Sequence, residues 1–194
     1  IMAVEVMGRN TGYLAAAAAA ARKTGWGPDL IYVPELTFDP EKFVKDVGEV
    51  VARKGKCLAV VAEGVKTADG KYLFEDTTVN KSEDPSRNMG GITPYLNMLL
   101  RRHFTCKIRC IDLGLMQRCA IHDASEIDKT EAEMLGREAV DRALAGESGR
   151  MMSLSRVSSS PYEVKTESLA LEAVADVERV MDLAYVRDNH ADIR

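Results

Sequence analysis

The chain has 194 residues, of which 46% are apolar and 29% charged, and its formal net charge is -4 at pH 7. This length and apolar content suffice for one sizeable core, or for one domain with an appended segment. Charges of both signs are mixed along the chain, which argues against a broad surface for nucleic acid, and the apolar stretch at residues 14–21 is far shorter than the roughly 20 residues of a membrane-spanning helix.

Two kinds of segment alternate along the chain. Short runs rich in Val, Ile and Leu predict strands at residues 1–6, 30–33, 58–61 and 108–113. Helical patterns occupy residues 12–24, 40–53, 91–104 and 127–144. The second of these begins with Asp39-Pro40, a cap residue followed by proline at the first helical position, and ends at Gly55. This order predicts an α/β fold, a mostly parallel sheet with helices on both faces.

The remaining segments are less regular. Residues 67–88 are polar, and the Asp69-Gly70 pair within them predicts a hairpin or an excursion between a strand and a helix. Residues 150–157 fit another strand, residues 158–161 a linker, and residues 168–186 carry apolar side chains at near-helical spacing. We therefore expect an α/β domain over residues 1–157. The linker and a C-terminal helix over residues 158–194 would pack on that domain or on one outside this chain.

The first strand ends in Met7-Gly8-Arg9, directly before an alanine-rich helix. Gly8 allows a backbone path that is closed to other residues, and Asn10 or Thr11 can cap the helix. The guanidinium of Arg9 and the positive end of the helix both favour a phosphate or a carboxylate. The motif is thus a candidate anion site, although Arg9 also fits a surface residue at a helix start.

Two later strands end in charged residues as well. Glu63 follows the third strand, and Arg118 lies beyond the fourth with Gln117 before it. Because the carboxyl ends of parallel strands meet at one edge of the sheet, Arg9, Glu63 and Arg118 should converge. Glu63 either pairs with an arginine or accepts hydrogen bonds from ligand hydroxyl groups. Arginines bind phosphate and a carboxylate binds sugar hydroxyls, so the group suits a phosphorylated sugar.

Other chemistries are poorly represented. The chain has no Walker loop, no G-x-G-x-x-G, no G-x-S-x-G and no H-E-x-x-H motif. Its four cysteines form no C-x-x-C or C-x-x-H pair, which argues against a metal site and favours reduced thiols in a cytoplasmic protein. His122 fits a turn or helix cap better than a ligand-binding role. Arg109 lies within a strand, where a solvent-facing charge at a sheet edge is the simplest interpretation.

Four segments resemble the carboxyl-terminal half of a 6-phosphofructokinase. They read V-E-V-M-G-R-N-T-G-Y-L-A at residues 4–15, V-P-E at 33–35, V-V-A-E-G at 60–64 and I-R-C-I-D-L-G-L-M-Q-R at 108–118. Their order and spacing also match, and the similarity extends over residues 1–154. The resemblance implies a phosphofructokinase-like second domain that binds fructose 6-phosphate.

The resemblance also implies roles for single residues. Met7, Gly8 and Arg9 correspond to the family's fructose-6-phosphate loop. Glu63 corresponds to its sugar-hydroxyl carboxylate, and Arg118 to its arginine on the 6-phosphate. Arg109 corresponds to an arginine that reaches a neighbouring subunit's phosphate, which implies a homo-oligomer, a dimer or a tetramer. Leu115 stands where ATP-dependent relatives carry histidine and many pyrophosphate-dependent ones tyrosine.

Two family motifs do not occur in these residues. They are the G-G-D-x-[ST] donor loop and the T-[IL]-D-x-D segment with the catalytic aspartate, which precede M-G-R in the family. The resemblance thus implies no catalytic residue in this chain, with Mg²⁺ and pyrophosphate, or less favoured ATP, bound elsewhere in a longer parent enzyme of glycolysis. A-E-G and Q-R-C-A favour pyrophosphate. The alternatives are a non-catalytic regulatory or scaffold module, and an unrelated α/β domain in which M-G-R is a structural cap.

Overall fold

The computed structural model describes residues 1–73, 91–187 and 190–191. The chain forms two compact units, Ile1–Cys119 with Arg179–Arg194, and Ala120–Glu178. We call them unit 1 and unit 2. The chain passes between the units after residues 119 and 178, whereas the sequence suggested a division at residue 157.

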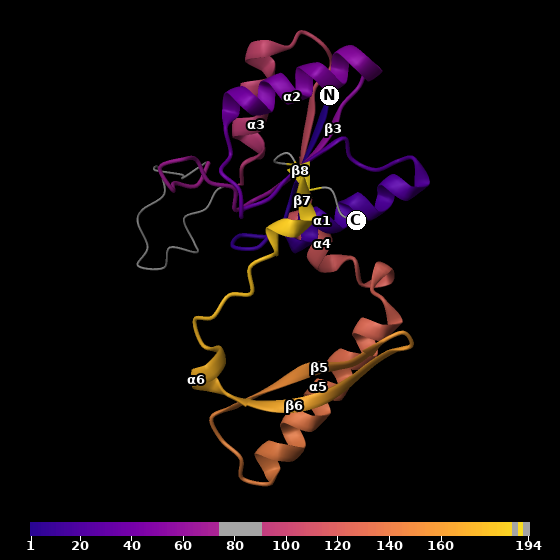
Figure 1. Cartoon of the computed structure of the whole chain (residues 1–194), viewed down its shortest axis with the longest axis vertical. Helices are drawn as coiled ribbons and strands as arrows, with labels where there is room; N and C mark the ends of the chain where they lie inside the picture. Colours follow the sequence, from indigo (N-terminus) through magenta and orange to yellow (C-terminus); the bar gives the residue numbers. More distant parts are fainter. Residues whose placement is uncertain (74–90, 188–189, 192–194) are drawn as a thin grey trace. The chain divides into compact units, whose positions relative to one another are not determined.

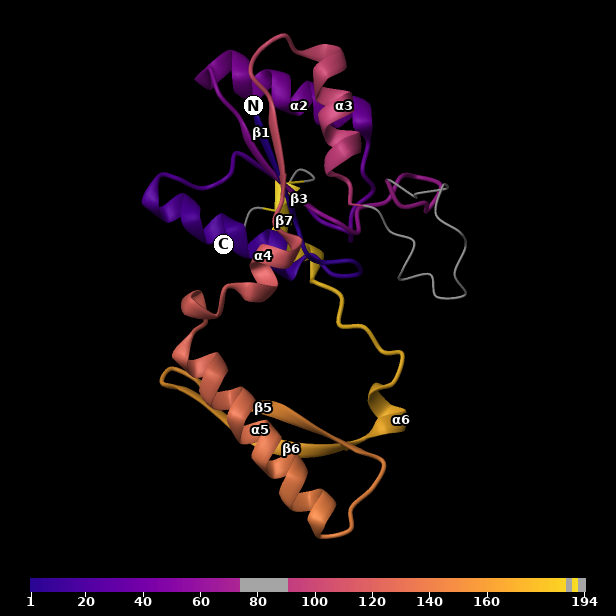
Figure 2. The same ribbon diagram turned by 180° about the vertical axis from the view of Figure 1, so that it is seen from behind.

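Unit 1 is built around a four-stranded parallel sheet in the order β2-β3-β1-β4 (Figures 1 and 2). The strands are β1 (Met2–Val6), β2 (Leu30–Tyr32), β3 (Leu58–Ala62) and β4 (Arg109–Asp112). At the carboxyl edge Val6 lies opposite Ala62, and at the amino edge Met2 lies opposite both Leu58 and Arg109. The expected α/β fold with a parallel sheet is confirmed.

Helices cover both faces of this sheet (Figures 1 and 2). Helices α2 (Pro40–Lys54) and α3 (Thr93–His103) lie on one face, and α1 (Tyr13–Ala17) with the 3₁₀ helix η1 (Ala18–Thr24) lies on the other. Asp39 caps α2 as expected, because its Oδ1 accepts hydrogen bonds from the backbone N–H of Glu41 at 2.9 Å and of Lys42 at 3.2 Å. The short helix α4 (Gly114–Cys119) follows β4.

The start of α1 differs from expectation. Neither Asn10 nor Thr11 is the N-cap; that position belongs to Gly12, and no side chain caps it in the usual way. Instead the backbone N–H of Gly12 donates to Glu35 Oε1 at 2.8 Å. A Cβ on Gly12 would lie 2.5 Å from the Cβ of Val33, so the helix start is packed too closely against the end of β2 for any larger residue.

The core of unit 1 explains the alanine run and the aromatic residues. Ala15, Ala16 and Ala19 are buried, and α1 contacts β2 and β3, so small side chains allow this segment to lie close to the sheet. On the other face Tyr32 contacts Phe38 and Phe43 edge to face, with ring centroids 5.4 and 5.2 Å apart. None of the described helices combines the length and apolar character needed to cross a membrane.

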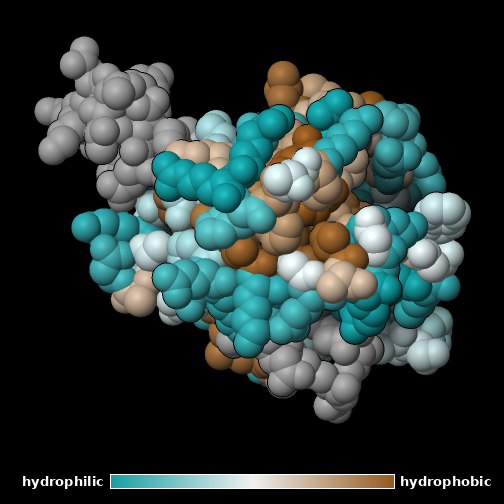
Figure 3. Space-filling view, turned by 90° about the horizontal axis from the view of Figure 1, so that it is seen from above, coloured by the Kyte–Doolittle hydropathy of each residue, from teal (hydrophilic) through white to brown (hydrophobic). Residues whose placement is uncertain are grey.

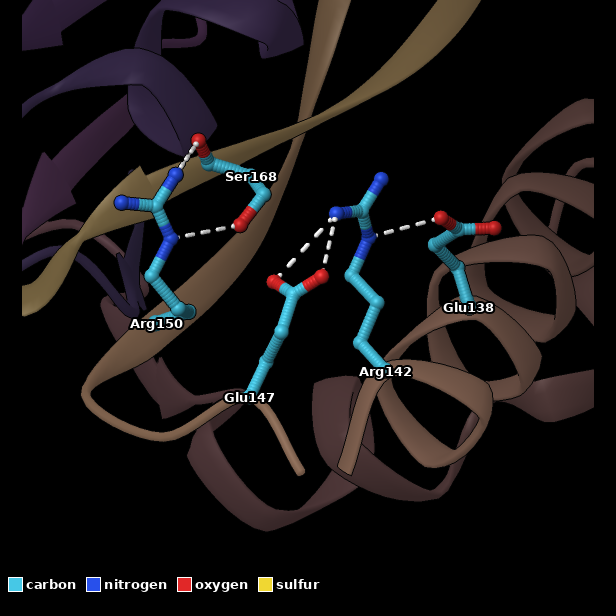
Figure 4. Close-up of polar contacts among 5 residues, drawn as sticks. All are labelled: Glu138, Arg142, Glu147, Arg150 and Ser168. Carbon is cyan, nitrogen blue, oxygen red and sulfur yellow. Dashed lines mark hydrogen bonds and ion pairs between the residues drawn. The ribbon is translucent and has the colours of Figure 1, made fainter. Parts of the chain in front are cut away.

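Unit 2 consists of a helix and a β-hairpin. The helix is α5 (Glu126–Leu144), preceded by the 3₁₀ turn η3 (Ile121–Asp123), and the antiparallel strands are β5 (Arg150–Ser159) and β6 (Tyr162–Ala170). Arg142 on α5 binds Glu138 at 2.7 Å and Glu147 at 3.1 Å, while Arg150 donates to Ser168 across the hairpin (Figure 4). Among described residues, the buried apolar core includes none from unit 2.

The helix expected over residues 168–186 is wrong. Residues 168–170 complete β6, where Ser168 pairs with Met152 and Leu169 with Met151, so hairpin pairing overrides the helical spacing. Within this range only α6 (Leu171–Val174) is α-helical, and Asp176, with φ +58°, follows in the left-handed conformation, which does not continue an α-helix. The expected strand at residues 150–157 is confirmed as part of β5. Of the expected linker, residues 158–159 continue β5 and residues 160–161 form the turn of the hairpin.

The C-terminal residues return to unit 1. They contain the 3₁₀ helix η4 (Leu183–Tyr185) and the short strands β7 (Val186–Arg187) and β8 (His190–Ala191). Met181, only 3% exposed, belongs to the core of unit 1, and its N–H donates to Glu35 Oε1 at 3.2 Å.

The polar segment after β3 begins with the expected turn. Gly70 has φ +77°, and the N–H of Thr67 donates to the carbonyl of Lys71 at 2.9 Å. Lys66 and Tyr72 then pair in an antiparallel bridge. The rest of the expected hairpin, residues 74–88, lies outside the described residues.

Candidate functional site

The candidate site is built on the loop after β1, which carries Met7, Gly8 and Arg9. Gly8 has φ +135°, and a Cβ there would lie 2.7 Å from the backbone oxygen of Thr11, so only glycine fits. The N–H of Gly8 donates to Glu63 Oε1 at 3.2 Å. The expected approach of Glu63 to this loop is therefore present in the structure.

The loops after β1 and β3 are in direct backbone contact. The N–H of Glu63 donates to the carbonyl of Val6 at 2.9 Å, and the N–H of Gly64 donates to the carbonyl of Gly8 at 3.3 Å. A Cβ on Gly64 would lie 1.7 Å from the backbone oxygen of Arg9. This packing holds the Glu63 carboxylate beside the loop. Among the described residues Glu63 forms no ion pair, so its carboxylate is not held by an arginine there.

Helix α4 reaches the same loop through Gln117. The N–H of Met7 donates to Gln117 Oε1 at 2.8 Å, although these residues are 110 positions apart. Arg118, the next residue, is exposed in the last turn of α4. Leu115, on the same helix, is 75% exposed. An apolar side chain is thus presented to solvent at the position where the family that the sequence resembles carries histidine or tyrosine.

Arg9 itself contacts an aromatic residue that the sequence did not single out. Its guanidinium lies 5.4 Å from the centroid of the Tyr72 ring, and its Nε donates to the Tyr72 hydroxyl at 3.4 Å. Lys66 Nζ lies 4.7 Å from the same centroid. Two positive charges therefore lie around the Tyr72 ring, one from the loop after β1 and one from the segment after β3.

Two carboxylates that support the site were also missed. Glu5 in β1 is 3% exposed, and its Oε2 accepts hydrogen bonds from the backbone N–H of Thr93 at 2.8 Å and from its hydroxyl at 2.6 Å. This contact fixes the start of α3 against the sheet. Glu35 joins Gly12 to Met181, as described above, while its Oε2 is buried. A carboxylate inside an apolar strand is the signal that could have identified Glu5.

Arg109 lies away from this group. It pairs with Met2 at the amino edge of the sheet, and Met2 precedes Met7 by five residues, which is roughly 16 Å along a strand. Arg109 lines a pocket of about 580 Å³ at that edge, together with Met2, Trp26 and Lys54. Viewed from above, apolar surface gathers in the middle of the visible face and hydrophilic side chains surround it (Figure 3).

His122 falls in unit 2, in the 3₁₀ turn η3, where its Nε2 lies 3.3 Å from Asp123 Oδ2. This position fits the turn that the sequence favoured for it. Within the ranges that the structure describes, no three His, Cys, Asp or Glu side chains are grouped as they would be around a metal ion.

Comparison with known proteins identifies the family. The family model described as Phosphofructokinase matches residues 1–143. A pyrophosphate–fructose 6-phosphate 1-phosphotransferase of Halomonas elongata is 33% identical over 97% of this chain and 45% of its own length. An ATP-dependent 6-phosphofructokinase 2 of Clostridium perfringens is 35% identical over 79% of this chain and 40% of its own length.

A solved structure agrees with these matches. The crystal structure of a pyrophosphate-dependent phosphofructokinase from Marinobacter aquaeolei superposes with a TM-score of 0.79 and 30% identity, covering all of this chain and 44% of that one. The chain thus spans less than half the length of the relatives it matches. The family match over most of its residues and the shared fold lead to one conclusion: this chain belongs to the phosphofructokinase family.

Proposed function

We propose that the chain is the fructose-6-phosphate-binding part of a 6-phosphofructokinase. One observation carries this proposal: the loop after β1 is bonded on one side to Glu63, through the N–H of Gly8, and on the other to α4, through the N–H of Met7. Arg9 and Arg118 belong to these same segments. Two arginines and a carboxylate therefore share one edge of the sheet.

The roles follow from the chemistry of these side chains. A guanidinium offers paired N–H donors that match phosphate oxygens, so Arg118 would bind the 6-phosphate and Arg9 would add positive charge nearby. Glu63 Oε1 already accepts a hydrogen bond from Gly8, and its Oε2 would accept one from a sugar hydroxyl. Leu115 supplies no polar contact, so the phosphate would depend more heavily on arginine.

The reaction of the longer enzyme would be phosphoryl transfer to the 1-hydroxyl of fructose 6-phosphate. Pyrophosphate is the favoured donor, because A-E-G at residues 62–64 and Q-R-C-A at residues 117–120 resemble the pyrophosphate-dependent members. ATP is the second candidate, since relatives named for either donor match this chain. Mg²⁺ would accompany the donor in the parent enzyme. Phosphoryl transfer depends on positioning donor and acceptor together, so this chain alone should be inactive.

Three further expectations belong to the same proposal. The enzyme would act in glycolysis and in the cytoplasm. It would form a homo-oligomer, in which Arg109, at the edge opposite Glu63, would serve a neighbouring subunit's phosphate site. Titration of the parent enzyme with fructose 6-phosphate, with and without the change Arg109→Met, would test this last point when sedimentation shows that the enzyme is an oligomer. A residue that binds phosphate across an interface alters sugar-phosphate affinity only in the oligomer.

Calorimetric titration of the 194-residue chain with fructose 6-phosphate tests the central claim. Hydrogen bonds to charged groups contribute about 1.5–3 kcal/mol, so Arg118→Met should weaken binding about 10- to 150-fold. Arg101→Met is the matched control, because Arg101 is an exposed arginine on α3 that bonds Asn97 within its own helix. Absence of binding at millimolar fructose 6-phosphate, or equal affinities of the two variants, would contradict the proposal.

A non-catalytic regulatory module is the second candidate function. The missing donor motifs and the exposed Leu115 motivate it. The candidates are separated by mixing the chain with a separately produced amino-terminal half of a relative and assaying pyrophosphate-dependent formation of fructose 1,6-bisphosphate. Recovered activity favours the enzyme, whereas sugar-phosphate binding without recovered activity favours the regulatory module.

A further inference from the structure

Tyr72 brings two cations together beside the candidate site. The Arg9 guanidinium and Lys66 Nζ lie 5.4 and 4.7 Å from its ring centroid, both within the range of a cation–π interaction. The Tyr72 hydroxyl also accepts a hydrogen bond from Arg9 Nε at 3.4 Å. All three residues are half-buried, so water screens these contacts less than it would on an open surface.

The ring performs a task that the backbone cannot. Gly64 packs against the backbone oxygen of Arg9, which fixes where the arginine side chain begins but not where its guanidinium lies. An arginine side chain loses considerable rotamer freedom when it is immobilised, and binding is stronger when that loss precedes the arrival of the ligand. Tyr72 provides such an anchor. Its negative ring face also offsets the repulsion between Arg9 and Lys66.

We propose that Tyr72 is a positioning residue of the sugar-phosphate site. It holds the Arg9 guanidinium against the segment that follows β3 and brings Lys66 to the same ring. The ligand class is a phosphorylated sugar, with Arg9 and Lys66 as paired cations for its anionic part. The ligand part of this inference rests on the proposed function, whereas the anchoring of Arg9 does not.

Arginine labelling tests the anchoring without any ligand. The rate at which phenylglyoxal modifies Arg9 would be followed by peptide mass spectrometry in the wild type, in Tyr72→Phe and in two ring-free variants, Tyr72→Leu and Tyr72→Met. Loss of the ring should accelerate modification of Arg9 about two- to fivefold. Tyr72→Phe keeps the ring and should stay close to the wild type. Unchanged labelling of Arg9 in a folded ring-free variant overturns the proposal.

A matched control exists in unit 2. The Arg156 guanidinium lies 5.2 Å from the centroid of the Tyr162 ring, so Tyr162→Leu removes an arginine–tyrosine contact of the same kind in the other unit. This change should accelerate labelling of Arg156 and leave Arg9 unaffected. Circular dichroism identifies any variant that fails to fold, and two ring-free substitutions are used so that one can replace the other.

Titration with fructose 6-phosphate completes the experiment. The ring-free variants should bind about two- to fivefold more weakly than the wild type, and Tyr72→Phe should retain most of the affinity. Equal affinity of the wild type and the ring-free variants overturns the positioning role. If the wild type does not bind fructose 6-phosphate, the proposed function fails, and the labelling rates alone then decide whether Tyr72 anchors Arg9.

Discussion

Replacing Gly64 by alanine should damage both the fold and the site. The added Cβ would lie 1.7 Å from the backbone oxygen of Arg9, where contacts shorter than 3.0 Å essentially do not occur. Gly64 is not among the glycines with positive φ, so the backbone conformation itself would tolerate alanine. The expected effect is therefore steric. To bring the 1.7 Å contact up to 3.0 Å, the loops after β1 and β3 must move apart by more than about 1 Å, which is close to the length of a covalent bond.

The size of the loss follows from two contributions. Separating the loops breaks the hydrogen bond from Gly64 N–H to the carbonyl of Gly8, which contributes about 0.5–1.5 kcal/mol. Forcing extra volume into a close-packed contact costs about 1–3 kcal/mol. Gly64→Ala should thus lower the free energy of unfolding by about 1.5–4.5 kcal/mol. It should also weaken fructose-6-phosphate binding, because the loops that carry Arg9 and Glu63 are no longer packed against each other.

Urea unfolding followed by circular dichroism measures this change. Gly136→Ala is the control, because Gly136 lies in the exposed part of α5, no atom lies within 4 Å of its added Cβ, and alanine is the better helix former by up to about 1 kcal/mol. The control should be neutral or stabilising. A Gly64→Ala variant within about 0.5 kcal/mol of the wild type, below the usual effect of a severe clash, would refute the claim that the two loops are rigidly packed.

Two further predictions concern titratable groups. Burial alone would raise the pKa of Asp29, but hydrogen bonds from Lys54 and from the N–H of Leu58 outweigh it and lower the pKa below 3.8. The stability that this lowered pKa provides is present above pH 3.8 and is lost as the pH falls through the lower folded-state pKa. Asp29→Asn should therefore destabilise the chain at pH 7 but much less near pH 2. A difference in urea midpoints between the variant and the wild type that does not change with pH would contradict this. Burial raises the pKa of the Cys57 thiol from 9.0 to about 12, which lowers its thiolate fraction about a thousandfold. Iodoacetamide at pH 8 should therefore label the exposed Cys106 well before Cys57, and equal labelling of Cys57 in folded and urea-unfolded protein would disprove its burial.

The sheet of unit 1 was predictable because its signals are local. Short β-branched runs, the Asp39-Pro40 start and the Gly55 stop mark strands and a helix by their own chemistry, and they lie within one or two residues of the observed bounds. The helix expected over residues 168–186 failed for the opposite reason. Its first three residues, 168–170, instead pair with β5, a partner that lies elsewhere in the sequence, and after Leu171–Val174 the chain leaves the helical conformation.

The candidate site was predictable only in part. The rule that parallel strands end at one edge correctly brought Glu63 to the Met7-Gly8-Arg9 loop. Gln117 and Tyr72 were not foreseen as contacts of this loop, because their approach depends on how two connecting segments fold back after their strands. The position of Arg109, by contrast, could have been predicted. As the first residue of β4 it must lie at the amino edge of the parallel sheet, opposite the edge that carries Glu63.

The path of the chain through unit 1 has a consequence for folding. Met181 completes the core of unit 1 and bonds Glu35, which precedes it by 146 positions, and the whole of unit 2 is synthesised between the two. During translation the sheet of unit 1 must therefore wait, with part of its apolar surface uncovered, until the residues of unit 2 have left the ribosome. The conformational entropy lost on closing so long a loop is only slightly larger than for a shorter one, but the length of the loop delays the final contact. The interval before that contact is the period in which this chain is most exposed to misfolding and in which a chaperone would act.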